Sequence, residues 1–319
     1  MHKKTKLICI GILATAIVTI SIYNFDFFKR TPLKEHKVKL VIDAENKNTL
    51  PPKFRTTSDT ISLHKKGSLN LSGLSDLNAS GSGAFSEDEL KSIKNKIGNK
   101  PIVDIDLRQE SHIFVNGIGI SWYGKNDDAN LNLTSSEVLK DENNKLMRIS
   151  KDKKVTFDKL SKKKSISNIS QLNDVKSVET EEQLAKALGI NYSRITVPDH
   201  KTPDDAQINS FVSFVKNLPK GTWLHFHCRG GKGRTTTFMA MYDMMINSKK
   251  VSFYDIMKRQ KLIGGADLLS GQDSLGKSDA EKRVQLLKKF YNYCQNNNDN
   301  FKTSWTNYNN KYRIKNLQR

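Results

Sequence analysis

A glycine-rich loop with a cysteine at one end and an arginine at the other constrains this chain more than any other segment. Cys228 and Arg234 lie six positions apart, with two cations and three glycines between them. Residues 222–227 before the loop are aromatic and apolar and predict a short strand. Residues 235–245 after it are rich in methionine and predict a buried helix. A strand, a glycine loop and a helix in this order are a unit of α/β folds.

The residues inside the loop are of the types that bind a phosphate group. They are Arg229, Gly230, Gly231, Lys232 and Gly233. Backbone N–H groups of such a loop bind anions, and the start of the following helix adds partial positive charge. Arg234 can donate two parallel hydrogen bonds to phosphate oxygens. The same field lowers the pKa of Cys228, whose thiolate would be a nucleophile for phosphoryl transfer.

A phosphatase of this kind also needs an acid that gives a proton to the leaving oxygen. Asp199, 29 residues before Cys228, is the candidate. Thr202 and Pro203 then predict the start of an amphipathic helix, with Thr202 as its N-cap. The alternative for Asp199 is an ordinary turn residue. Its place just before the helix and strand that lead to the loop favours the general acid.

These residues and three further segments give the chain a family resemblance. It resembles the bacterial protein-tyrosine-phosphatase-like inositol polyphosphatases, the cysteine phytases. The stretches that carry the likeness fall within residues 51–295 and are 52–56 (PKFRT), 80–86 (SGSGAFS), 106–123 and 198–237. The resemblance implies an α/β fold of the protein-tyrosine-phosphatase type. Such a fold has a central mixed sheet flanked by helices, and a small accessory β subdomain.

The resemblance also implies an activity, the stepwise removal of phosphates from inositol hexakisphosphate without a metal or other cofactor. By this likeness Cys228 would be the nucleophile, Arg234 the phosphate clamp and Asp199 the general acid. The expected partner is therefore a small polyanionic substrate, an inositol polyphosphate.

Four further residues receive roles from the same resemblance. Thr235, directly after the clamp, would hydrogen-bond the thiolate, and His227, directly before the nucleophile, would orient it. Arg55 and His200 would contact other phosphates of the substrate.

Two loop residues depart from the family's usual pattern. Arg229 and Lys232 are cations where many members have an acidic or small residue. Such cations are similar to those of phosphoinositide phosphatases, so a phosphoinositide or phosphotyrosine substrate is an alternative with the same mechanism. A third interpretation is a phosphate-binding module without catalysis. A binding module, however, needs neither the nucleophile Cys228 nor the acid Asp199.

The charge balance agrees with an acidic substrate. The chain has 53 Lys and Arg against 33 Asp and Glu, a formal net charge of +20. A field of this sign attracts a polyanion, more strongly at low salt. We interpret the lysines within residues 151–164 as a solvated loop. No zinc-ligand spacing, helix-turn-helix signature or RNA-binding aromatic pattern indicates a nucleic acid partner. These features leave the oligomeric state open.

The first 30 residues predict export. A basic start precedes an apolar run over residues 7–23, which is typical of a signal peptide or a signal anchor. Lysines before the run favour a body outside the cytoplasmic membrane. We therefore expect a protein that is secreted, or anchored at the outer face of the membrane if the segment is not cleaved. Beyond this segment only Cys228 and Cys294 remain, too few for a disulfide framework.

The rest of the chain predicts one catalytic domain in which helices alternate with apolar strands, as in α/β sheets. We divide it into a linker (31–50), the catalytic domain (51–295) and a polar C-terminal tail (296–319). The linker includes a first short strand at 38–42. Residues 125–175, rich in lysine and asparagine, are the hardest to interpret and are the candidate accessory subdomain. Capping boxes at Ser86 and Thr180 predict two helix starts.

Overall fold

Cys228 follows a central strand of a five-stranded sheet with the order β10-β4-β11-β3-β2. The strands are β2 (Arg55–Thr56), β3 (Ala79–Ser82), β4 (Ile102–Arg108), β10 (Asn191–Val197) and β11 (Trp223–His227). The first four in the sheet order run parallel, and β2 is antiparallel to β3. Because parallel strands share one carboxyl edge, the residues that follow β4, β10 and β11 meet there. This edge carries the site described below.

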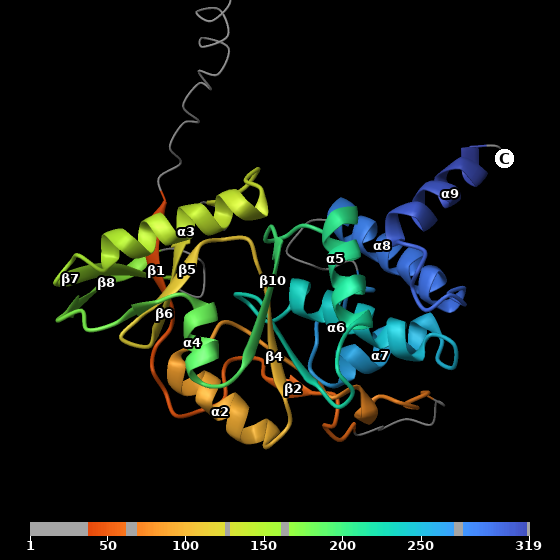
Figure 1. Cartoon of the computed structure of the whole chain (residues 1–319), viewed down its shortest axis with the longest axis horizontal. Helices are drawn as coiled ribbons and strands as arrows, with labels where there is room; N and C mark the ends of the chain where they lie inside the picture. Colours follow the sequence, from red (N-terminus) through yellow and green to blue (C-terminus); the bar gives the residue numbers. More distant parts are fainter. Residues whose placement is uncertain (1–37, 62–68, 125–127, 161–165, 271–276, 318–319) are drawn as a thin grey trace, which may run out of the picture. The chain divides into compact units, whose positions relative to one another are not determined.

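The computed structural model describes residues 38–61, 69–124, 128–160, 166–270 and 277–317 (Figure 1). Residues 38–319 form one compact unit. The predicted export segment, residues 1–30, lies outside the described residues, so export stays a prediction. Among the residues with described positions, no helix has the length and apolar character needed to cross a membrane.

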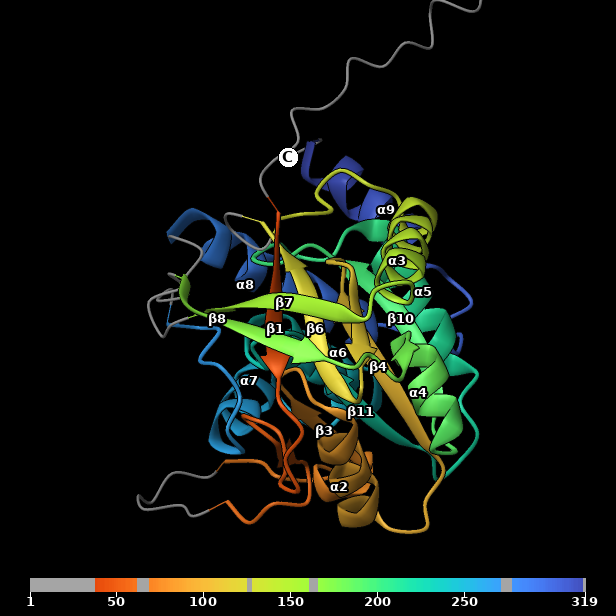
Figure 2. The same ribbon diagram turned by 90° about the vertical axis from the view of Figure 1, so that its left-hand side faces the viewer.

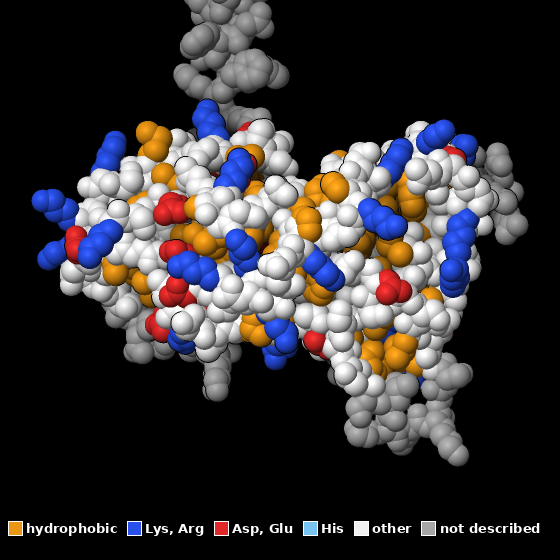
Figure 3. Space-filling view, turned by 60° about the horizontal axis from the view of Figure 1, so that its bottom comes forward, with side chains coloured by type: hydrophobic (Ala, Val, Ile, Leu, Met, Phe, Trp, Pro, Cys, Tyr) orange, Lys and Arg blue, Asp and Glu red, His pale blue; other side chains and the backbone are white. Residues whose placement is uncertain are grey.

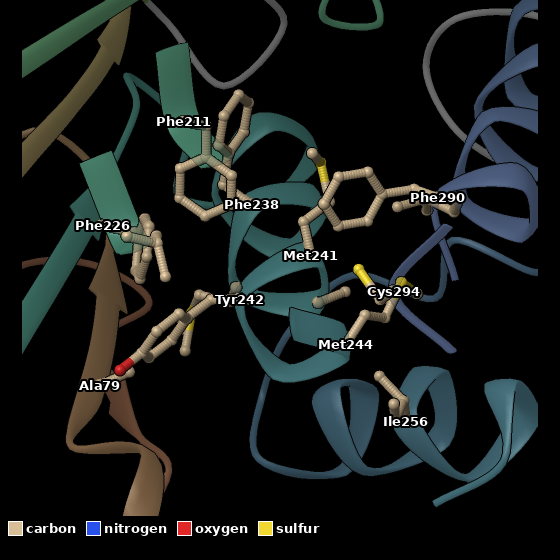
Figure 4. Close-up of a cluster of buried hydrophobic side chains, with 14 of the residues drawn as sticks. Ala79, Phe211, Phe226, Phe238, Met241, Tyr242, Met244, Ile256, Phe290 and Cys294 are labelled. Atoms are coloured by element: carbon tan, nitrogen blue, oxygen red, sulfur yellow. The ribbon is translucent and has the colours of Figure 1, made fainter. Parts of the chain in front are cut away.

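One face of the sheet is covered by a group of helices that share the largest apolar core (Figure 1). They are α5 (Asp205–Lys216), α6 (Gly233–Asn247), α7 (Phe253–Leu262), α8 (Lys277–Gln295) and α9 (Trp305–Leu317). Helix α6 is buried along most of its length, as its methionine-rich sequence predicts. Its Phe238 packs edge to face on Phe211 of α5, and the same core reaches Phe290 of α8 (Figure 4). This packing fixes the helix whose first turn closes the loop.

The opposite face is covered by two shorter helices, α2 (Glu87–Ile97) and α4 (Glu181–Ala187), over a second apolar cluster. Both begin with the predicted capping boxes, at Ser86 and Thr180. A short 3-10 turn, η1 (Ser75–Leu77), precedes β3. The predicted α/β architecture, with helices on both faces of a mixed sheet, is therefore correct.

The accessory β structure is a second sheet with the order β8-β7-β1-β6-β5-β9 (Figure 2). Its strands are β1 (Lys39–Ala44), β5 (His112–Val115), β6 (Ile118–Tyr123), β7 (Lys154–Leu160), β8 (Ile166–Asn173) and β9 (Val178–Glu179). Helix α3 (Ser135–Ile149) packs on it through Leu146 and Ile149. Residues 125–175 supply only part of this sheet, because β1, β5, β6 and β9 come from elsewhere in the chain.

Two predicted boundaries are wrong. The strand predicted at 38–42 within the linker 31–50 is confirmed as β1, but it is an inner strand paired with both β6 and β7, so the folded body begins before residue 51. The polar tail 296–319 contains α9, whose Trp305 is fully buried and donates a hydrogen bond from Nε1 to Asp205 Oδ1 at 2.7 Å. Two further contacts hold this helix, since Asn309 Nδ2 donates to Asp205 Oδ1 at 3.2 Å and Asn209 Nδ2 donates to Thr306 Oγ1 at 2.5 Å.

The helix before the catalytic strand also begins later than predicted. Its N-cap is Asp204, whose side chain accepts a hydrogen bond from the backbone N–H of Gln207, and Gln207 completes the capping box. Thr202 and Pro203 therefore belong to the preceding loop.

Candidate active site

The glycine loop is held tightly between β11 and α6, against the end of β3. Gly231 has a φ of +66°, and a Cβ at this position would collide with the backbone of Ser82 and Gly83. Only glycine fits both constraints. The Ala84 N–H donates to the carbonyl of Arg229 at 3.0 Å, which ties the loop to the segment after β3. The loop is thus fixed in one conformation at the start of α6.

Cys228 lies at the base of this loop and is 3% exposed. Thr235 Oγ1 donates a hydrogen bond to its Sγ at 3.2 Å. Burial alone would raise the pKa of the thiol, but the Arg234 guanidinium and the Thr235 hydroxyl outweigh it and lower the pKa below its ordinary value. The pKa of Cys228 is therefore shifted toward the thiolate, in the direction that the sequence predicts.

Protein groups hold Arg234 through its two Nη atoms. Its two Nη atoms donate to Glu110 Oε2 at 2.7 Å and Oε1 at 3.0 Å, and Nη1 also donates to the carbonyl of Val197 at 3.0 Å. Its Nε, although buried, has no acceptor among the residues that the structure describes. A buried donor without an acceptor costs free energy, and an anion bound in the loop would remove that cost.

Asp199 follows β10 and lies at the mouth of the loop. Its Oδ1 is 3.1 Å from Arg234 Nη2, and its side chain is 23% exposed. Its Oδ2 is 3.2 Å from Nε2 of His200, which has a φ of +60°. A positive φ at a non-glycine residue costs free energy and is typical of functional loops. The structure thus brings Cys228, Arg234 and Asp199 together at one edge of the sheet.

Glu110, which the sequence analysis did not single out, holds the clamp from behind. Its carboxylate is fully buried and lies between Arg234 and Arg108, with Arg108 Nε donating to Oε1 at 2.9 Å. Burial would raise the pKa of Glu110, but the two guanidinium groups hold it well below its ordinary range. Glu110 stood inside the 106–123 motif, yet nothing in its spacing indicated this contact.

His227 points away from the loop, into a buried network of histidines and carboxylates. Its Nε2 is 2.7 Å from Oε1 of Glu181, the first residue of α4. His112 Nε2 lies 3.1 Å from the other Glu181 oxygen and 3.2 Å from Asp106 Oδ2. Although burial opposes both shifts, the pKa of Glu181 falls to about 2 beside His227, and that of His112 rises to about 10 beside Asp106.

Two trios in this network have donor types that metals bind, within 4.8 Å of one another. They are Asp104, Glu181 and His227, and Asp106, His112 and Glu181. Arg194 Nε also pairs with Asp106 at 3.0 Å, and burial together with the neighbouring Glu181 raises the pKa of Asp104 well above its ordinary value. The network therefore fits a buried charge cluster that fixes His227.

Arg55 is not placed as predicted. It is 2% exposed, and Nη1 donates to the Gly231 carbonyl at 2.9 Å while Nη2 donates to Thr236 Oγ1 at 3.2 Å. A side chain buried in this way, with both Nη atoms donating to the protein, does not reach outer phosphates of a substrate. Arg55 supports the loop from below. His200, 25% exposed beside Asp199, does lie where a substrate could reach it.

The two loop cations differ in their surroundings. Lys232 is exposed. Arg229 is 19% exposed, its Nε donates to Asp43 Oδ1 at 2.7 Å, and its guanidinium lies 4.6 Å from the centre of the Tyr123 ring. The structure thus fixes one loop cation and leaves the other in solvent.

Residues 105–246 match the model of the PTP-like phytase family, described by the words "inositol hexakisphosphate". A PTP-like phytase from Bdellovibrio bacteriovorus is 32% identical, with a TM-score of 0.67, and the match covers 88% of this chain and 97% of that one. This chain belongs to the PTP-like phytase family. The identification confirms the resemblance drawn from the sequence, and it places the chain among phosphatases.

Other relatives are longer than this chain. The PTP-like myo-inositol phosphatase of Mitsuokella multacida, solved with myo-inositol-(1,3,4,5)-tetrakisphosphate, is 36% identical with a TM-score of 0.82. The match covers 89% of this chain and 49% of that one. The effector protein hopD2 of Pseudomonas syringae pathovar tomato is 30% identical over 80% of this chain and 57% of its own length. The chain thus spans about half the length of these two relatives.

Proposed function

We propose that this member of the PTP-like phytase family removes phosphate groups from inositol polyphosphates through a cysteinyl-phosphate intermediate. One observation carries the proposal. A thiol with a lowered pKa, a buried arginine with an open donor and a carboxyl group converge on one glycine loop. Phosphoryl transfer needs a nucleophile, a clamp for the phosphate and an acid for the leaving oxygen, and these three groups supply them.

In the first step the Cys228 thiolate attacks phosphorus. The S–P bond forms while the bond from phosphorus to the ring oxygen breaks, and Asp199 in its acid form gives that oxygen a proton. Arg234 and the loop N–H groups bind the phosphate oxygens, whose charge is redistributed in the transition state. The products are the alcohol with one phosphate fewer, a phosphorylated cysteine and the Asp199 carboxylate.

In the second step water attacks the phosphocysteine. The Asp199 carboxylate takes a proton from the water as the new O–P bond forms, and the S–P bond breaks to return the thiolate. Inorganic phosphate leaves, and the acid form of Asp199 is restored for the next cycle. No redox change occurs in either step.

Three observations support an inositol polyphosphate as the substrate. The chain has a net charge of +20, and Lys and Arg side chains are spread over the face in Figure 3 among fewer acidic ones. Lys232 is exposed on the loop itself. The relative from Mitsuokella is described as a myo-inositol phosphatase in complex with an inositol tetrakisphosphate. The loop cations also keep a phosphoinositide as the second candidate.

Phosphate release by the full-length chain tests the proposal. Inositol hexakisphosphate, a soluble short-chain phosphoinositide and a phosphotyrosine peptide are compared under reducing conditions at equal concentration. We expect the highest kcat/KM for inositol hexakisphosphate. A higher value for the lipid or the peptide would keep the mechanism and overturn the substrate, while no release from any of them would overturn both.

Asp199→Asn tests the acid. The variant keeps the shape of the side chain but cannot protonate a leaving oxygen, so we expect kcat on inositol hexakisphosphate to fall about 10²- to 10⁴-fold. p-Nitrophenyl phosphate, whose leaving group needs little protonation, should lose far less in a parallel assay. Equal losses on the two substrates would show that Asp199 acts in another way.

Arg55→Ala tests the revised role of Arg55. Loss of its bonds to Gly231 and Thr236 loosens the loop itself, so kcat/KM should fall by a similar factor, about 10- to 100-fold, on both substrates. The two rates are measured side by side on the same preparation. A loss confined to inositol hexakisphosphate would instead support a contact with outer phosphates.

A further inference from the structure

Asp43 connects the two sheets at the catalytic loop. It lies on β1 of the six-stranded sheet, and its side chain is 1% exposed. Its Oδ1 accepts from Arg229 Nε and its Oδ2 from Arg108 Nη2, each at 2.7 Å. Each oxygen of this buried carboxylate thus pairs with one arginine, and removing its charge would take one ionic partner from each of the two cations.

One ion pair of Asp43 is with Arg229, the residue that follows Cys228 in the loop. The Arg229 guanidinium is held by Asp43 and by the Tyr123 ring, and these residues lie on the adjacent strands β1 and β6. The backbone of Arg229 is fixed separately by the Ala84 N–H. The second sheet orients this side chain, which is 19% exposed, so part of its surface remains accessible.

The other ion pair of Asp43, with Arg108, connects it to Arg234, the last residue of the loop. Arg108 contacts Asp43 with Nη2 and Glu110 with Nε, and Glu110 in turn holds both Nη atoms of Arg234. Alternating charges therefore run without a gap from one end of the loop to the other. In order they are Arg229, Asp43, Arg108, Glu110 and Arg234.

We propose that Asp43 is a positioning residue for the reaction proposed above. It orients Arg229 toward a second phosphate of the substrate, and through Arg108 and Glu110 it fixes the Arg234 clamp. The first effect belongs to binding of polyphosphates, and the second to the chemical step on any substrate. The inference rests on the proposed function, and the two effects give it a signature that loss of stability alone would not produce.

The test compares Asp43→Asn with wild type in the full-length chain, on inositol hexakisphosphate and on p-nitrophenyl phosphate. Asparagine keeps the shape of the side chain and loses its charge. Because the clamp is misplaced, we expect kcat to fall about 10- to 100-fold on both substrates. Because Arg229 is released, KM for inositol hexakisphosphate should also rise about tenfold, with little change in KM for the monoester.

The variant Arg229→Gln separates the effect of Asp43 on substrate binding from its effect on the chemical step. It leaves Asp43 paired with Arg108, so the loss in kcat should be smaller than in Asp43→Asn, while KM for inositol hexakisphosphate rises about tenfold. Combined with Asp43→Asn, it should add nothing further to that KM, because both changes remove one interaction. Glu45→Gln is the matched control, since this acid directly follows β1 and its pair with Lys47, at 3.8 Å, lies on the surface.

The outcomes are distinct. A wild type that is active, with Asp43→Asn equal to Glu45→Gln, overturns the role of Asp43 and leaves the proposed function standing. A wild type that releases no phosphate from either substrate overturns the proposed function. If Asp43→Asn does not fold, Arg229→Lys tests the pairing of Asp43 with Arg229 instead, because lysine keeps the charge and lacks the Nε donor. A KM equal to wild type in both Arg229→Lys and Arg229→Gln would contradict the inference.

Discussion

Cys228→Ser should abolish phosphate release from every substrate, with kcat at least about 10⁴-fold below wild type. The serine hydroxyl has nearly the shape of the thiol, but its pKa is too high for Arg234 and Thr235 to ionise it. No phosphorylated intermediate can then form at this position. The loop N–H groups and Arg234 are unchanged, so inositol hexakisphosphate should still bind, and calorimetry on the variant measures that binding directly.

Cys294→Ser is the matched control for this result. Cys294 is the other buried thiol in the described part of the chain, and burial raises its pKa well above the ordinary value. It lies on α8 within the largest apolar core, so its replacement should lower stability and leave kcat unchanged. Alkylation followed by mass spectrometry should label Cys228 and spare Cys294. Turnover near wild type in Cys228→Ser would overturn the assigned nucleophile.

The catalytic loop could be predicted from the sequence because every signal for it is contiguous. β11, the glycine loop and α6 follow one another along the chain, so local patterns of apolar residues and glycines were enough. Asp199 followed from chemistry, since a nucleophile at Cys228 requires an acid nearby. The capping boxes at Ser86 and Thr180 were equally local, and both form as predicted.

The contacts that fix the loop could not be predicted, because they join residues far apart in the chain. Asp43 and Arg229 are separated by 186 positions, and Glu110 and Arg234 by 124. No periodicity shows which charged side chains will meet across two sheets. Arg55 illustrates the same limit, since the resemblance suggested an arginine for the substrate and the packing buries it under Gly231.

The misplaced boundaries have related causes. β1 is short and stands between polar residues, so only its pairing with β6 and β7 shows that it is an inner strand. α9 has few apolar residues, and its place in the fold depends on Trp305, which packs against Phe290 and Tyr293 of α8. Composition indicated polar ends in both places, whereas the pairing of β1 with two strands and the contacts of α9 with α5 and α8 make both segments part of the folded body.

Glu110→Gln should have the second largest effect, on stability and on activity together. The variant leaves the shape of the side chain but removes the charge that two buried arginines share. Breaking a buried pair in this way costs about 3–5 kcal/mol of the free energy of unfolding. Misplacement of Arg234 should also lower kcat about 100-fold or more on any phosphate ester. Chemical denaturation and phosphate release measure the two losses.

The loss of stability in Glu110→Gln should depend on pH in a way that identifies its cause. The arginines hold the folded pKa of Glu110 well below its ordinary value near 4.5, although burial opposes this. The contribution of the ionised Glu110 to the free energy of unfolding is therefore complete above pH 4.5 and is lost as the pH falls toward the folded pKa. The difference in free energy of unfolding between wild type and Glu110→Gln should be constant near neutral pH and should decrease below about pH 4.5. Glu182→Gln, which disrupts the exposed pair with Lys186, should cost less than about 1 kcal/mol at any pH. If this difference does not decrease in acid, the effect of Glu110→Gln comes from packing. The ion pairs of Glu110 with Arg108 and Arg234 would then have no role in stability.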